Sequence, residues 1–132
     1  QLSYPFELKT SPYTDAIEQK VSEWIDEYDC LNDFLRTKYK KSYFGNLTVL
    51  LYPEAAYDQL IVFARWILVA IAFDDVYGAF PWSELREKCN QVINILEGKS
   101  TVCENEIFRQ FMLIRKQKQI MHYRVCQHAA SI

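Results

Sequence analysis

The feature that most constrains this chain is a long apolar segment that ends in two adjacent acids. Residues 60–73 read LIVFARWILVAIAF, with Arg65 as the one charged side chain, and Asp74 and Asp75 follow directly. A helix over this segment would be about 21 Å long, which is shorter than the ~30 Å hydrocarbon core of a bilayer. We therefore expect no membrane span but a buried helix, surrounded by other helices because it is apolar almost all round.

Helical spacing of apolar residues and helix-ending residues recur along the rest of the chain. Gly45, in the sequence FGNLT, is expected to break the second helix, and no segment shows the alternation of a β-strand. The length fits one domain, so we predict a single all-α domain over residues 1–132 with about five helices. The predicted helices cover about 12–28, about 31–43, Pro53 to Gly78, Ser83 to Gly98 and about 104–128.

The composition excludes several classes of protein. Half of the residues are hydrophobic and 15% are aromatic, so we expect an ordered, compact chain. A net charge of −2 gives no indication of a nucleic-acid partner. The four cysteines form no CxxC or Cys/His pattern, which favours reduced thiols over a zinc or disulfide framework. The start, QLSYPFELKT, lacks the regions of a signal peptide, so a cytoplasmic location is expected.

The charge is unevenly distributed along the chain. No acid follows Glu106, whereas five basic residues do: Arg109, Arg115, Lys116, Lys118 and Arg124. The plain interpretation is a solvated face of the last helix. The alternative is that these cations help to hold a diphosphate group.

The acidic pair suits a hard cation. On a helix, Asp74 shares a face with apolar positions three, four and seven residues away: Ile67, Ala70, Ile71 and Tyr77, with Gly78. Mg²⁺ takes oxygen ligands and commonly combines one or two carboxylates with substrate phosphates. The spacing thus suits a substrate with a phosphate head at the acids and an apolar tail along the helix. The alternative is an ordinary solvated pair of acids near a helix end.

Several segments together resemble the N-terminal half of class I terpene synthases of the microbial, single-domain type. An extended YPF is followed by SPY, a helix bearing Trp24, and the run YPEAAYDQLIVFARWILVAIAFDD over residues 52–75, which ends in an aspartate-rich motif. The resemblance covers about residues 4–80 and continues more weakly through the last helix. It implies an α-helical bundle that binds a prenyl diphosphate, such as farnesyl diphosphate, with three Mg²⁺ ions in a complete site.

The resemblance also implies roles for individual residues. Asp74 corresponds to the first motif aspartate, a metal ligand, and Asp75 to its neighbour with a more supporting role. Ala70 and Ile71 occupy wall positions that are often aromatic in the family, so the rings that face a carbocation are expected elsewhere: Tyr77, Trp66 or Phe44. The implied reaction is that of a carbon–oxygen lyase, in which diphosphate leaves and the carbocation cyclises. No diphosphate-binding residue is assigned.

The chain departs from the family pattern in two respects. The third acid of the motif would fall at Gly78 or Ala79, neither of which can bind a metal. The second metal-binding motif, Asn-Asp-x-x-Ser/Thr-x-x-x-Glu, is not found, since Asn32-Asp33 lies upstream and has Arg36 in the hydroxyl position. A full synthase needs roughly twice this length, so we expect a fragment, half of a homodimer, or a degenerate relative.

Three hypotheses follow. In the first, Asp74 and Asp75 take part in Mg²⁺–diphosphate binding, and the chain ionises its substrate when further helices or a partner chain complete the site. In the second, the chain is a non-catalytic module of the same scaffold that binds a terpenoid or a partner helix. In the third, it is an unrelated helical bundle.

Overall fold

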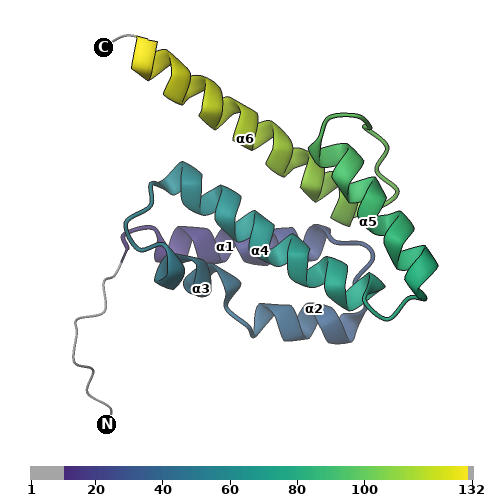
Figure 1. Cartoon of the computed structure of the whole chain (residues 1–132). Helices are drawn as coiled ribbons and strands as arrows, with labels where there is room; N and C mark the ends of the chain where they lie inside the picture. Colours follow the sequence, from purple (N-terminus) through teal and green to yellow (C-terminus); the bar gives the residue numbers. More distant parts are fainter. Residues whose placement is uncertain (1–10, 131–132) are drawn as a thin grey trace.

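The chain forms six α-helices in the computed structural model, which describes residues 11–130 and the side chains of residues 11–119 (Figure 1). They are α1 (Thr14–Glu27), α2 (Asp33–Lys40), α3 (Phe44–Leu51), α4 (Tyr57–Tyr77), α5 (Trp82–Leu96) and α6 (Glu106–Ala130). The described residues contain no strand, and the all-α prediction is confirmed. The expected extended start and the side chains of Arg124 and Cys126 lie outside the described residues.

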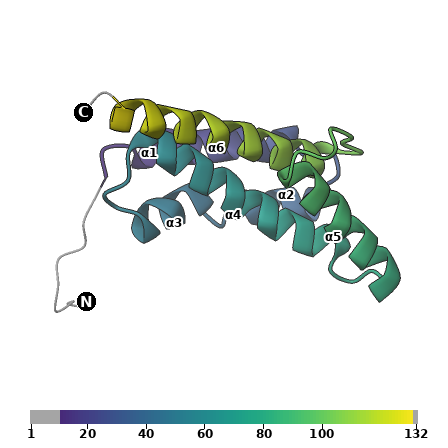
Figure 2. The same ribbon diagram turned by 45° about the horizontal axis from the view of Figure 1, so that its top comes forward.

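Helix α4 lies at the centre of the packing. It contacts α1, α3 and α6, while α5 packs on α6 and α2 packs on α1. Figure 1 shows α6 on one side of α4 and the pair α2 and α3 on the other, and Figure 2 shows α6 running beside α4. Its inward side chains include Leu60, Ala64, Leu68 and Ala72, which have no exposed surface. The apolar segment is therefore a core helix, as its composition predicts. No helix in the described part of the chain is long and apolar enough to cross a membrane.

The one charged residue of the apolar segment, Arg65, lies among core side chains. Its guanidinium stacks over the Trp24 ring at 4.1 Å and donates a hydrogen bond to Gln110, which is fully buried. Burial lowers the pKa of Arg65 because the charged form loses hydration. The aromatic face and the amide oxygen partly replace that hydration, so α4 can carry a cation inside the bundle.

Asn32 and Arg36, which partly match the second metal-binding motif in sequence, have structural roles between α1 and α2. The Asn32 side chain accepts a hydrogen bond from the Leu35 amide at 2.8 Å, which caps the N-terminus of α2. Arg36 donates to the carbonyls of Ile25 and Tyr28 at 2.7 and 3.0 Å, where α1 ends. Asn32 and Arg36 therefore serve the ends of two helices.

The segment around Gly45 forms helix α3, which the sequence pattern did not predict. The second helix ends at Lys40, before Gly45, and Tyr43 with a φ of 53° turns the chain. A Cβ atom at Gly45 would lie 2.6 Å from the Cα of Glu18, so the missing side chain lets α3 lie directly against α1. The chain does break between the second helix and Gly45, as predicted, but Gly45 itself lies inside α3. Its role was missed because it depends on the neighbouring helix α1.

Helix α4 begins later than the sequence predicts but ends where it was expected to end. Pro53 lies in a turn and the helix begins at Tyr57, where the Gln59 side chain accepts a hydrogen bond from the Ala56 amide at 3.1 Å. The helix ends at Tyr77, next to Gly78, as expected. Pro81 precedes α5, and Gly98 with a φ of 78° follows its end.

Candidate functional site

The two acids occupy the last turn of α4 and are both exposed. Within the described part of the chain, no side chain forms a hydrogen bond or ion pair with the Asp74 carboxylate, so its counter-charge is not supplied there. Gly78 shapes the space next to it: a Cβ at Gly78 would lie 2.4 Å from the Asp74 carbonyl oxygen and 2.9 Å from Oδ1. The position where a third acid was considered thus has to stay small.

Asp75 is held by a residue that sequence reasoning did not connect with it. The Tyr39 hydroxyl donates to Oδ2 of Asp75 at 2.5 Å, and the Tyr39 ring is 1% exposed in the core. Burial, followed by the hydrogen bond to Asp75, raises the pKa of Tyr39, so this hydroxyl remains a donor at neutral pH. The two acids therefore differ: Asp75 is hydrogen-bonded to α2, whereas no described side chain binds Asp74.

The apolar positions expected to form a pocket wall divide into two groups. Ala70 and Trp66 are exposed, and Ile67 and Ile71 are half-buried, so these four form an open strip of α4 that leads to Asp74. Tyr77 and Phe44 are instead buried in the core. Tyr77 contacts the rings of Phe73, Phe80 and Phe108, and its hydroxyl accepts a hydrogen bond from Asn105 at 2.6 Å.

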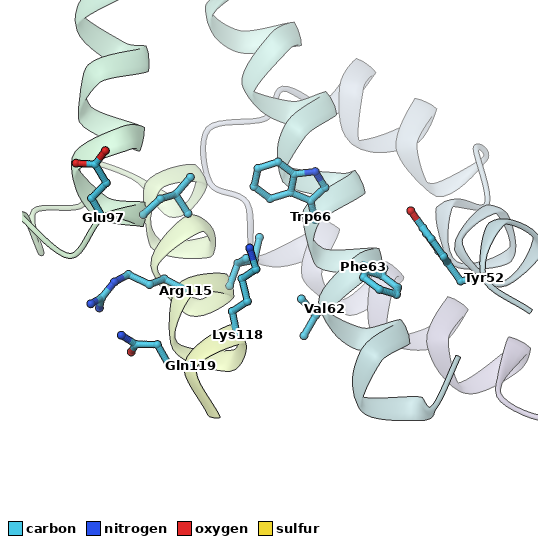
Figure 3. A pocket seen from close by; sticks show the side chains of 10 residues that line it. Tyr52, Val62, Phe63, Trp66, Glu97, Arg115, Lys118 and Gln119 are labelled. Atoms are coloured by element: carbon cyan, nitrogen blue, oxygen red, sulfur yellow. The ribbon is translucent and has the colours of Figure 1, made fainter. Parts of the chain in front are cut away.

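A cavity lies beside this strip, between α4 and α6 and next to the end of α5 (Figure 3). We call it the α4–α6 hollow; its volume is about 960 Å³. Its lining residues are Tyr52, Val62, Phe63, Trp66, Leu96, Glu97, Ile114, Arg115, Lys118 and Gln119. Phe63 precedes Asp74 by about three helical turns, so both lie on the same side of α4. That spacing is a signal by which sequence reasoning could have found Phe63.

The donor set at the acids meets part of what Mg²⁺ requires. Among the described residues, no side chain binds the Asp74 carboxylate, and Asp75 uses one oxygen for Tyr39 and has a second one. Two carboxylates completed by water and phosphate oxygens match the usual Mg²⁺ environment. Among the described residues, no group of three or more His, Cys, Asp or Glu could hold a metal ion. The residues thus fit a cation that is shared with a phosphate ligand better than a cation held by protein alone.

Comparison with known proteins identifies relatives of one kind. The chain is 33% identical over 75 residues to a (+)-T-muurolol synthase ((2E,6E)-farnesyl diphosphate cyclizing) from Roseiflexus castenholzii. The matched segment covers 57% of this chain and 23% of that protein. It is 24% identical over 119 residues to the germacrene A synthase of Nostoc punctiforme, covering 86% of this chain and 37% of the synthase. A sesquiterpene synthase of Metarhizium brunneum is 35% identical over 68 residues, which cover 51% of this chain and 20% of the fungal protein. The chain is a distant, partial homologue of class I sesquiterpene synthases.

The homology confirms the resemblance to class I terpene synthases and agrees with the all-α fold. The matched segments span between 20% and 37% of these relatives' own lengths. No family model matches the chain, and no solved structure does. The roles of single residues in this terpene synthase homologue therefore rest on its own geometry.

Proposed function

We propose that this chain binds a prenyl diphosphate, such as farnesyl diphosphate, together with Mg²⁺ at the C-terminal end of α4. The observation that carries the proposal is the Asp74 carboxylate, which no described side chain binds, at the end of an open apolar strip. A phosphate head and a prenyl tail need these two surfaces next to each other. The relation to sesquiterpene synthases supports this substrate class.

Each residue of the site has a distinct task in this proposal. Asp74 would be the principal metal ligand, and Asp75, fixed by Tyr39, would be the secondary one. Bound Mg²⁺ would offset the negative charge of the diphosphate and so make the diphosphate a better leaving group. Ala70, Ile67 and Trp66 would cover the tail and exclude water from it. In an active assembly this arrangement would ionise the substrate to a carbocation for cyclisation.

The test measures ligand-dependent stability of the chain. Mg²⁺ and farnesyl diphosphate together, at a hundred times the dissociation constant, should stabilise it by about 2.7 kcal/mol, visible as a raised melting temperature. Asp74→Asn should abolish this gain, and Asp75→Asn should reduce it. Asp15→Asn is the matched control, since it removes an exposed acid from the first turn of α1, where Tyr13 packs on Tyr57 at the opposite end of α4 from Asp74. A shift that survives in Asp74→Asn, or no shift at saturating ligand, would contradict the proposal.

A second candidate function is binding without turnover. The observation that favours it is that the described residues offer two carboxylates and no larger cluster of metal-binding side chains. In that case the chain would hold a terpenoid, or a helix of a partner, against the open strip of α4. Release of inorganic diphosphate by the purified chain, dependent on Mg²⁺ and lost in Asp74→Asn, would exclude this candidate.

A further inference from the structure

We propose that the α4–α6 hollow binds an amphiphilic anion: a small molecule with an apolar chain and one carboxylate or phosphate head, held without a metal ion. Its volume of about 960 Å³ lies within the range of small-molecule sites, roughly 300–1,000 Å³. It is open enough for a chain to enter from solvent, and Trp66 in its wall is 45% exposed. A surface of this kind favours an apolar ligand.

The apolar part of the hollow is preformed. The Phe63 ring stacks on Tyr52 with centroids 4.3 Å apart, and the Trp66 ring meets Phe111 edge-on at 5.8 Å. Both rings are therefore held by neighbours from other segments. Because these rings already pack on neighbouring rings, a ligand that covers them loses less affinity to side-chain ordering than it would on isolated side chains.

The polar part of the hollow is cationic. Lys118 and Arg115 lie three residues apart on α6 and so share a face, and both line the hollow (Figure 3). Arg115 packs against Gly98, at the C-terminal end of α5, where helix carbonyls carry partial negative charge. Lys118 forms no ion pair among the described side chains. The one acid in the lining, Glu97, pairs with Lys99 at 2.7 Å, so the hollow keeps a positive charge.

This cationic end and the acid pair lie at opposite ends of the α4 strip. Trp66 and Asp74 are eight residues apart, about 12 Å along the helix axis. Without a metal, Asp74 and Asp75 repel an anion, whereas Lys118 attracts it. The head group of a metal-free anion is therefore expected at Lys118. This inference does not depend on the metal site, because it concerns binding in the absence of divalent cations.

The experiment uses isothermal titration calorimetry of the full chain in EDTA, below the micellar concentration of each probe. Dodecyl phosphate and dodecanoate should both bind, and their relative affinity tells which head group is preferred. Lys118→Gln should weaken both by about tenfold, and Trp66→Ser should weaken them as well through lost apolar contact. Lys116→Gln is the matched control, since Lys116 is an exposed lysine of the same helix that does not line the hollow.

Two comparisons decide whether the head group is recognised. Dodecanol, which has the same chain without a charge, should bind at least tenfold more weakly than dodecyl phosphate, and dodecyltrimethylammonium should bind more weakly still. Raising the salt concentration should weaken the anion and leave dodecanol unchanged. Equal affinity for dodecanol and dodecyl phosphate, equal effects of Lys118→Gln and Lys116→Gln, or no binding in EDTA would each overturn the inference.

Discussion

The Tyr39 hydroxyl donates a hydrogen bond to Oδ2 of Asp75 across 2.5 Å and ties the last turn of α4 to α2. A tyrosine from the core thus orients one of the two acids at the candidate site. The other acid, Asp74, is bound by no described side chain. The adjacent carboxylates are therefore not equivalent, although they are identical in chemistry.

Replacing Tyr39 by Phe should destabilise the chain by about 1.5 kcal/mol, because a hydrogen bond to a charged acceptor is lost while the ring keeps its packing. Urea unfolding measures this change in the free energy of unfolding. Tyr43→Phe is the matched control, since the Tyr43 side chain is exposed and forms no described hydrogen bond. If both variants unfold at the same urea concentration, the Tyr39–Asp75 bond does not stabilise the fold.

Stability should fall with rising pH above about pH 10. Burial raises the pKa of Tyr28 and of Tyr39 above the usual tyrosine value. In the unfolded chain these groups ionise near pH 10, whereas the folded chain keeps both protons. The folded state then binds more protons than the unfolded state. Each tyrosine therefore lowers the free energy of unfolding by about 1.4 kcal/mol for each pH unit above about pH 10.

The measurement for this pH effect is urea unfolding from pH 7 to 11. Above pH 10, the free energy of unfolding of Tyr39→Phe should fall less steeply with pH than that of the wild type. The difference in slope should equal the contribution of one tyrosine. Between about pH 7 and 9 the two curves should run parallel. Parallel curves over the whole range would mean that Tyr39 ionises normally in the folded chain.

An acid at position 78 should damage the fold, whereas an acid at position 79 should not. The 2.4 Å distance from a Cβ at Gly78 to the Asp74 carbonyl oxygen forces the helix end to shift, and overpacking of this kind costs about 1–3 kcal/mol. Ala79 is exposed. Thermal unfolding of Gly78→Asp and Ala79→Asp compares the two sites directly. Equal stability of both variants would show that Gly78 has room for a side chain.

Gly45→Ala should destabilise the chain although alanine is the better helix former. The gain in helix propensity is about 1 kcal/mol. The new Cβ, however, would meet the Glu18 backbone at 2.6 Å, and backbone of α1 cannot move aside as a side chain can. We expect a net loss of about 1–2 kcal/mol in urea unfolding. Asn46→Ala, at the next and exposed position, should be nearly neutral. A stabilised Gly45→Ala would indicate that α1 and α3 can separate slightly.

Local chemistry and periodicity in the sequence were sufficient to predict the all-α class, the central apolar helix and the acids at its end. A 3.6-residue apolar pattern encodes a helix, and residues three, four or seven apart share a face whatever surrounds them. For this reason the spacing alone places Ile67, Ala70 and Asp74 on one strip of α4. The relation to sesquiterpene synthases is likewise found from the amino-acid sequence alone.

Tertiary packing alone decided the rest, because it joins residues that are distant along the chain. Gly45 reads as a helix break until α1 is seen against it, and Tyr39 acts on Asp75 from 36 residues away. Tyr77, expected at a pocket wall, is buried because Phe108 of α6 packs against it. The hollow likewise exists only where α4, α5 and α6 meet. Contacts of this kind depend on which helices become neighbours, and local periodicity does not encode that choice.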